Sequence, residues 1–135
     1  MEPEVAAWLE RFVTAHGGVA GSVHHLRGDV LVITAAHRLP DPVVRVTATI
    51  PRGKGMAGLA WERDVPIQTC NLKTDETGNV KPGARAVDAQ AAVALPVHGP
   101  DGGLRAVVGI AWAREGDLDA ATVDTLMKAA EAVPG

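Results

Sequence analysis

The sequence lacks or nearly lacks several residue types that build specialised sites. Its only cysteine is Cys70, so the chain contains neither an internal disulfide nor a cysteine-based zinc site. Tyrosine is absent and phenylalanine occurs once. No apolar run approaches the roughly 20 residues that span a membrane. The N-terminus, MEPEV, is acidic, whereas a secretory signal begins with basic residues. We therefore expect a cytoplasmic protein that does not engage a membrane.

The charge distribution excludes a further class of partner. Lysine and arginine number 13 against 16 aspartates and glutamates, for a net charge of -3, and the basic residues form no cluster. A nucleic-acid surface needs such a cluster to neutralise phosphates, so we expect no nucleic-acid partner. The 47% hydrophobic and 21% charged residues are ordinary for a globular protein. We expect one domain over residues 1–135, long enough to bury its own core.

Apolar residues at three- and four-residue steps predict a helix at each end of the chain. The first covers Glu2 to His16 and ends at Gly17-Gly18. The last opens after Asp119, a plausible N-cap. The two predicted apolar stripes consist of Val5, Trp8, Leu9, Phe12 and Val13, and of Val123, Leu126, Met127, Ala130 and Val133.

The middle of the chain alternates between apolar and polar residues, as an antiparallel sheet with one wetter face does. Arg27-Gly28-Asp29 is placed to join the first two strands as a tight hairpin. Val43 to Ile50 follows Pro40-Asp41-Pro42 and is predicted as a third strand, with Val44, Val46, Ala48 and Ile50 on one side. The other predicted strands are Val19 to Leu26, Val30 to Ala36, Gln90 to Val97 and Leu104 to Trp112. A short helix over residues 56–63 and a polar segment over 71–87 lie between them, and such a long loop is typical of a functional lid.

The segment Gly53-Lys54-Gly55-Met56-Ala57-Gly58 has the letters of the dinucleotide-binding fingerprint G-x-G-x-x-G. That fingerprint needs a buried parallel strand before it and a full crossover helix after it. Here the preceding strand is polar on alternate residues and the helix is short. We therefore interpret the glycines as a tight strand-to-helix turn. In an intermediate interpretation, the helix start, with Arg52 and Lys54 nearby, holds an anion.

The potentially reactive side chains do not form a recognisable catalytic or metal motif. No histidine lies near Cys70 in the sequence to activate its thiol, so we expect it to line a pocket or to be passive rather than catalytic. His24 and His25 are adjacent on a strand and point to opposite faces. No H-x-x-E or H-E-x-x-H spacing occurs, so we expect no metal site.

Several segments in order resemble the GAF domain, a small-molecule sensing fold, over roughly residues 4–133. The resemblance rests on the glycine turn and helix with Trp61, on the strand edge Asp64-Val65-Pro66-Ile67, and on three later segments. These are Ala92-Val93-Ala94-Leu95-Pro96-Val97, Leu104 to Ile110, and Leu118 to Asp124.

The resemblance implies an α+β fold with a central antiparallel sheet of roughly five to six strands. The terminal helices would cover one face, and the short helix and long loop would enclose a ligand pocket on the other. We expect Arg52 and Lys54 at the mouth of that pocket. The residues expected to line it are Trp61, Thr69, Cys70, Asn71, Gln90 and Ala92.

Members of this family bind cyclic nucleotides, bilins, haem, nitrate or amino-acid-like metabolites. Cys70 comes too early for bilin attachment, and Asn71 to Glu76 lacks the phenylalanine of the cyclic-nucleotide signature. We therefore name no cofactor.

One enzyme branch, the free methionine sulfoxide reductases, resembles GAF domains and uses several cysteines. Its reactive cysteine would fall in or after the glycine turn, where this chain has Met56 and Ala57. Thiol exchange also needs a second cysteine. We therefore expect a protein that is not an enzyme.

The expected function is that of a sensor. It would bind a small polar or anionic metabolite and pass its state to a regulatory protein such as a kinase, as a homodimer. Two alternatives remain: an interaction module with a collapsed pocket, which dimerises or docks through its terminal helices, and a cryptic enzyme that uses Cys70.

Overall fold

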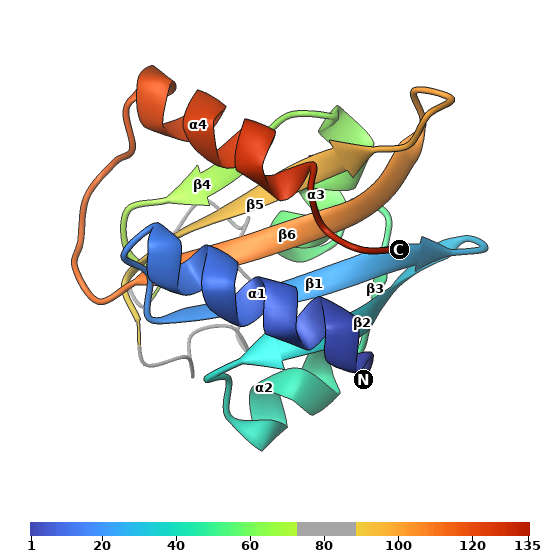
Figure 1. The fold of residues 1–135 in the computed structure, drawn as a ribbon, viewed down its shortest axis with the longest axis horizontal. Helices are drawn as coiled ribbons and strands as arrows, with labels where there is room; N and C mark the ends of the chain where they lie inside the picture. The colour runs from blue at the N-terminus through green and yellow to red at the C-terminus, as the bar shows by residue number, and fades with distance from the viewer. Residues whose placement is uncertain (73–88) are drawn as a thin grey trace.

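A computed structural model describes residues 1–72 and 89–135, which form one six-stranded sheet and four helices (Figure 1). The strand order is β3-β2-β1-β6-β5-β4, and every neighbouring pair of these strands is antiparallel. This confirms the predicted α+β fold with a central antiparallel sheet. In chain order, the elements are α1 (Pro3–Ala15), β1 (Ala20–Arg27), β2 (Val30–His37), α2 (Asp41–Val46), β3 (Thr49–Pro51), α3 (Gly55–Arg63), β4 (Ile67–Thr69), β5 (Ala91–His98), β6 (Leu104–Trp112) and α4 (Ala120–Ala130).

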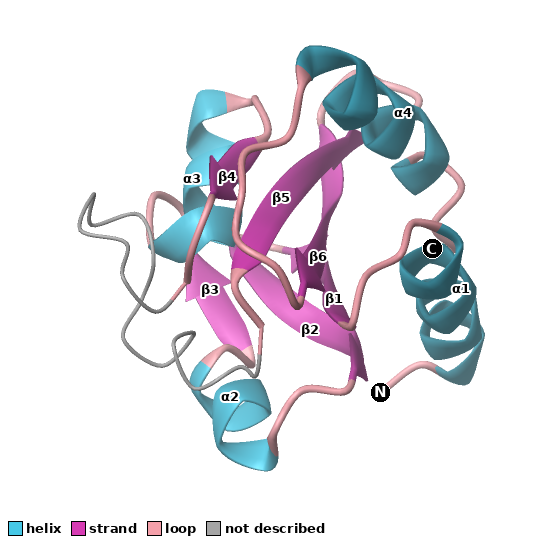
Figure 2. Cartoon of the chain, turned by 90° about the vertical axis from the view of Figure 1, so that its left-hand side faces the viewer, coloured by secondary structure: helices cyan, strands magenta, loops and turns pink. Residues whose placement is uncertain are grey.

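The helices divide between the two faces of the sheet. Figure 2 shows α1 and α4 on one side, and α2 and α3 on the other. Successive residues of a strand point to opposite faces, so each strand contributes to both layers. The predicted polar segment over residues 71–87 falls almost entirely outside the described residues.

The main hydrophobic core lies between the sheet and the two terminal helices. Its helical part comes from the predicted apolar stripes apart from Val123, with Leu9 and Leu126 at most 1% exposed. The rings of Trp8 and Phe12 stack 4.9 Å apart. Leu95, Val108 and Ile110 supply part of the sheet side of this core. This layer buries large side chains, each of which stabilises the fold by about 1.5–3 kcal/mol.

The start of α4 follows the predicted capping pattern. The Asp119 carboxylate accepts a hydrogen bond from the Thr122 backbone N–H at 2.7 Å. Side-chain and backbone hydrogen bonds from Thr122 lower the pKa of Asp119. The N-cap prediction is confirmed, since this carboxylate satisfies one of the amides that a helix start leaves unpaired.

The predicted third strand over Val43 to Ile50 is wrong. Residues Asp41–Val46 form helix α2, and only Thr49–Pro51 pair with β2. Pro42 lies in the first helical turn, where a missing N–H is tolerated, so the prolines start a helix here instead of opening a strand. The Thr47 hydroxyl then donates to the Val43 carbonyl at 2.7 Å at the helix end. Val43 is buried and Val46 is 54% exposed, as on the two sides of a helix.

The segment after α4 is tied to the sheet by side chains that bind its carbonyl oxygens. The Arg105 guanidinium donates to the Glu131 and Val133 carbonyls at 3.0 and 2.8 Å. The His25 Nε2 atom lies 2.9 Å from the Pro134 oxygen, and its Nδ1 atom lies 2.7 Å from the Thr34 hydroxyl. Because a carbonyl only accepts, Nε2 carries the proton, and the Thr34 hydroxyl that faces Nδ1 also lies 3.4 Å from the Val23 carbonyl oxygen. Burial is the main cause that lowers the pKa of His25 below its usual 6.5.

We predict that His25 makes the folded state less stable in mild acid. A lowered folded-state pKa means that the unfolded chain binds the proton more readily, so this stability is present above pH 6.5 and is lost as the pH falls below it. The slope contributed by one such histidine is at most about 1.4 kcal/mol per pH unit. Urea unfolding at about pH 7.5 and about pH 5.5 measures this change in the wild type.

The matched variant for this prediction is His25→Gln, whose amide N–H₂ still offers a donor to the Pro134 carbonyl but does not titrate. We expect its unfolding free energy to fall less between the two pH values than that of the wild type. Other histidines contribute equally to both proteins, so the difference isolates His25. Parallel pH dependences of the two proteins would show that His25 does not have this role.

Candidate functional site

A cavity of about 140 Å³ lies on the face of the sheet that carries α2 and α3. Strands β1, β5 and β6 form its floor. Leu39, Val43 and Thr47 contribute to its walls from α2 and the residues beside it, and the start of α3 contributes Gly55, Met56 and Ala57. The cavity lies on the predicted side of the sheet, opposite α1 and α4.

The floor exists because small residues meet across three adjacent strands. Residues two apart on one strand point to the same face, and the strand register sets their neighbours. Two rows cross from β5 through β6 to β1 and leave space that longer side chains would fill. These rows are Ala94, Gly109 and Ser22, and then Ala92, Ala111 and Ala20.

Gly109 lies at the centre of one row because of its close approach to Ser22. A Cβ atom built on Gly109 would lie 2.9 Å from the Ser22 hydroxyl oxygen, closer than ordinary side chains approach each other. Because Gly109 has no side chain, the Ser22 hydroxyl can lie over the floor at this point.

His24 links the floor to the wall. Its side chain lines the cavity, is 3% exposed, and its Nε2 atom lies 2.7 Å from the Thr47 carbonyl oxygen. The carbonyl can only accept, so Nε2 is the donor. This hydrogen bond connects β1 to the end of α2. His25, the next residue, binds Thr34 and Pro134, so the prediction that the two rings point to opposite faces is confirmed.

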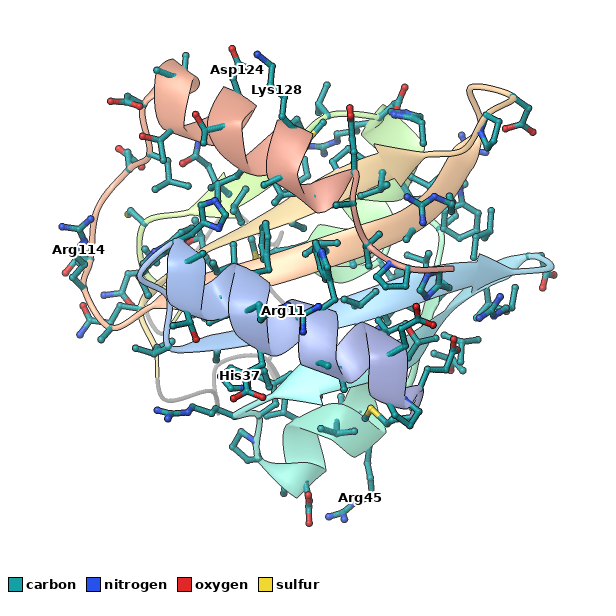
Figure 3. The ribbon with its side chains drawn as sticks, in the orientation of Figure 1. Arg11, His37, Arg45, Arg114, Asp124 and Lys128 are labelled. Carbon is teal, nitrogen blue, oxygen red and sulfur yellow. The ribbon has the colours of Figure 1, made fainter. Side chains whose placement is uncertain are left out.

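The lining is mostly apolar and carries no full charge among the described residues. Its polar side chains are Ser22, His24 and Thr47. The Ser22 hydroxyl makes no hydrogen bond to any part of the chain that the structure describes, and it is not sealed from the cavity. Figure 3 shows Arg45 on the outer side of α2, and Asp124 and Lys128 on the outer side of α4.

Ala92 is the residue of the predicted set that lines this cavity. Trp61 is partly buried and packs beside the Leu31 and Ile50 cluster under α3. Arg52 and Lys54 are exposed near the start of α3. Neither residue is among the described residues that line the cavity, so their predicted role at its mouth stays a prediction.

The remaining predicted residues lie along the segments on either side of 73–88. Thr69 is buried and its hydroxyl lies 3.3 Å from the Asn71 backbone nitrogen. Cys70 is exposed. The Gln90 backbone bonds to Trp112 and Leu72 at 2.8 and 2.6 Å. The structure brings these residues near the sheet edge but does not include them in the described lining, so their binding role stays a prediction.

Sequence reasoning did not select Ser22, His24, Thr47 and Gly109 as site residues. A signal was present: Ala20, Ser22 and His24 alternate along β1, and Gly109 and Ala111 alternate along β6. Small residues spaced by two mark a sheet face that large side chains do not fill. Their alignment across strands depends on register, which no single strand reveals.

The glycine turn before α3 has a structural explanation. A Cβ atom on Gly58 would lie 2.5 Å from the Pro51 carbonyl oxygen, and one on Gly53 would collide with the Glu62 carboxylate. Gly53 also has a φ of +81°, which favours glycine. The antiparallel sheet removes the parallel crossover that dinucleotide binding needs.

Within residues 1–72 and 89–135, no group of three potential ligands is arranged to hold a metal ion. No helix in the same residues is long and apolar enough to cross a membrane.

No protein-family model matches the sequence, and no curated protein does. Solved structures do match the fold. The GAF domain of a phosphoenolpyruvate-protein phosphotransferase from Coxiella burnetii has a TM-score of 0.74 at 18% identity, covering 94% of this chain and 79% of that one. A putative GAF sensor protein from Burkholderia vietnamiensis has a TM-score of 0.65 at 14% identity, covering 96% and 90%.

Enzymes share the fold as well, which corrects the expectation that this chain is not an enzyme. The free methionine-R-sulfoxide reductase from Neisseria meningitidis, solved with its substrate, has a TM-score of 0.65 at 17% identity, covering 92% of this chain and 75% of that one. The prediction weighed the number and position of the cysteines and treated the fold as one that mostly binds. Because the fold carries both sensors and enzymes, it does not exclude catalysis.

At these identities the similarity establishes architecture, and function has to be argued from the cavity. The chain has a GAF-like fold.

Proposed function

We propose that this protein is a GAF-type regulatory domain that binds a small molecule in the cavity under α2 and α3. The observation that carries the proposal is the floor of six small residues in register on three strands. Protein interiors are close-packed, and small-molecule sites are concave, mostly apolar pockets with a few polar groups, as this one is. The solved reductase with its substrate supports the proposal by analogy of fold.

The lining favours a largely apolar ligand over an anionic one. An anion taken into this cavity would meet no lysine or arginine among the described lining residues, and an unpaired buried charge is costly. Arg52 and Lys54, the cations that suggested an anion, are exposed.

We also propose that occupancy is passed to a partner protein through the two strands that hold the C-terminal segment. Strand β1 carries His24 in the cavity and His25 on the Pro134 carbonyl. Strand β6 carries Gly109 in the floor and Arg105 on the carbonyls that follow α4. A ligand that shifts either strand therefore acts on the anchors of that segment, which is a contiguous physical route.

The first prediction for this function is that protein purified gently carries a small molecule that native mass spectrometry detects as excess mass. Ala92→Phe would place a ring over the floor and should remove that mass, since the ring takes the ligand's space. Ala121→Phe is the matched control, because it makes the same change on the exposed side of α4.

The control variant should retain the wild-type excess mass. If the Ala92→Phe protein is folded, as judged by thermal unfolding, and still carries the same excess mass as the wild type, the ligand binds outside this cavity. If the wild-type protein carries no excess mass, and if no metabolite of a test panel raises its thermal unfolding temperature, the sensor function would be contradicted. If that protein were also a tight dimer, the interaction module would replace the sensor.

A second prediction concerns assembly. We propose a homodimer in which α1 and α4 pair, with Ala6 and Met127 near the seam. Ala6 and Met127 are only partly buried against the main core, so each leaves apolar surface for a partner helix, whereas Val13 is 1% exposed and belongs to that core. Sedimentation equilibrium at micromolar concentration should give twice the 14.0 kDa chain mass.

The variant for this test is Met127→Glu, which would put a charge at the proposed seam. It should shift the wild-type mass toward that of one chain, whereas Asp124→Lys on the outer side of α4 should not. A wild type that sediments as a single chain at all concentrations would reject the dimer.

A further inference from the structure

We infer that the ligand is a neutral single-ring molecule, aromatic or of equal size, that carries one hydroxyl or carbonyl group bound by Ser22. This inference rests on the proposed function and adds the chemical class of the ligand. Three features of the cavity lead to it: its volume, its shape and its polar groups.

The volume sets the size of the ligand. The cavity measures about 140 Å³. An engineered apolar cavity of about 150 Å³ in another protein takes up benzene. One six-membered ring with a small substituent therefore matches the space.

The floor sets the shape. Neighbouring strands lie about 4.8 Å apart and residues two apart on a strand about 6.7 Å apart. The two rows of three small residues therefore offer a flat area of roughly 10 by 7 Å between β1 and β5. That area suits the face of a planar ring. Leu39, Val43, Met56 and Leu72 provide apolar walls around it, and a methionine adapts well to an aromatic edge.

The polar groups set the functional group. The Ser22 hydroxyl lies on this floor over Gly109 and makes no hydrogen bond to the described residues. A hydroxyl both donates and accepts, so a ligand hydroxyl or carbonyl can pair with it. None of the described lining residues is an aspartate, glutamate, lysine or arginine, so none of them compensates a ligand charge, and this favours a neutral ligand.

The experiment titrates purified protein with three probes of known chemistry: phenol, toluene and benzoate. Phenol and toluene have the same shape and number of heavy atoms, and differ by the hydroxyl. Benzoate adds a charge. Dissociation constants come from chemical-shift changes of backbone amides, which also report whether residues of the floor respond.

We expect the wild type to bind phenol about fivefold tighter than toluene, the effect of one hydrogen bond, and to bind benzoate more weakly than phenol. Ser22→Ala should bind toluene like the wild type and lose the preference for phenol. Ala92→Phe should bind none of the probes, whereas Ala121→Phe should bind all three like the wild type.

Three results would overturn the inference: benzoate binding more tightly than phenol, a wild type that prefers neither phenol nor toluene, or an unchanged preference in Ser22→Ala. A failure of this inference is distinguishable from a failure of the proposed function. If no ring probe binds but gently purified wild type carries a mass that Ala92→Phe lacks, the cavity binds a ligand of another class. If that mass is also absent, the proposed function fails too.

Discussion

The size of six side chains on one face of the sheet is the constraint on which the site depends. Ala94, Gly109 and Ser22 form one cross-strand row, and Ala92, Ala111 and Ala20 form the other. Side chains this short leave a space of about 140 Å³ that is partly open to solvent. A chain that keeps such a space forgoes packing energy that leucines or valines at these positions would supply.

The opposite face compensates for that loss. There α1 and α4 cover large buried side chains such as Leu9, Leu95 and Leu126. The same strands therefore serve two purposes. Along each strand, every second residue points into the core under α1 and α4, and the alternate residues point toward the cavity. His24 and His25 show this division most directly, because one ring lines the cavity and the other anchors the chain after α4.

The fold does not choose between binding and catalysis, since sensors and sulfoxide reductases are built on it. The lining of the cavity is the basis of the proposed binding function. Here the polar groups are a serine hydroxyl, a threonine and a histidine whose Nε2 atom is already bonded to the end of α2. This arrangement supports recognition of an uncharged molecule, and the hydrogen bond from His24 to Thr47 joins the floor to the helix that covers it.

Local sequence patterns alone determined most of the secondary structure. The stripes of α1 and α4, the Asp119 cap, the hairpin at Gly28 and the span of β6 are local patterns, and the chain follows them. The family resemblance placed the helices on the correct faces. Residues 41–50 escaped local reasoning, because a proline pair before alternating valines is compatible with either a strand or a helix that begins at proline. In the helix, Val43 joins the same buried hydrophobic cluster as Ala20 and Ala111, which favours this conformation.

Only the tertiary structure decided which residues bound the cavity. Trp61, Cys70 and Arg52 were selected for their places beside the predicted loop and the glycine turn, whereas the described floor is made of alanines, a glycine and a serine. Such residues carry no signal one by one. They form a site only when strand register aligns them across β5, β6 and β1, and register follows from pairing between segments far apart in the chain.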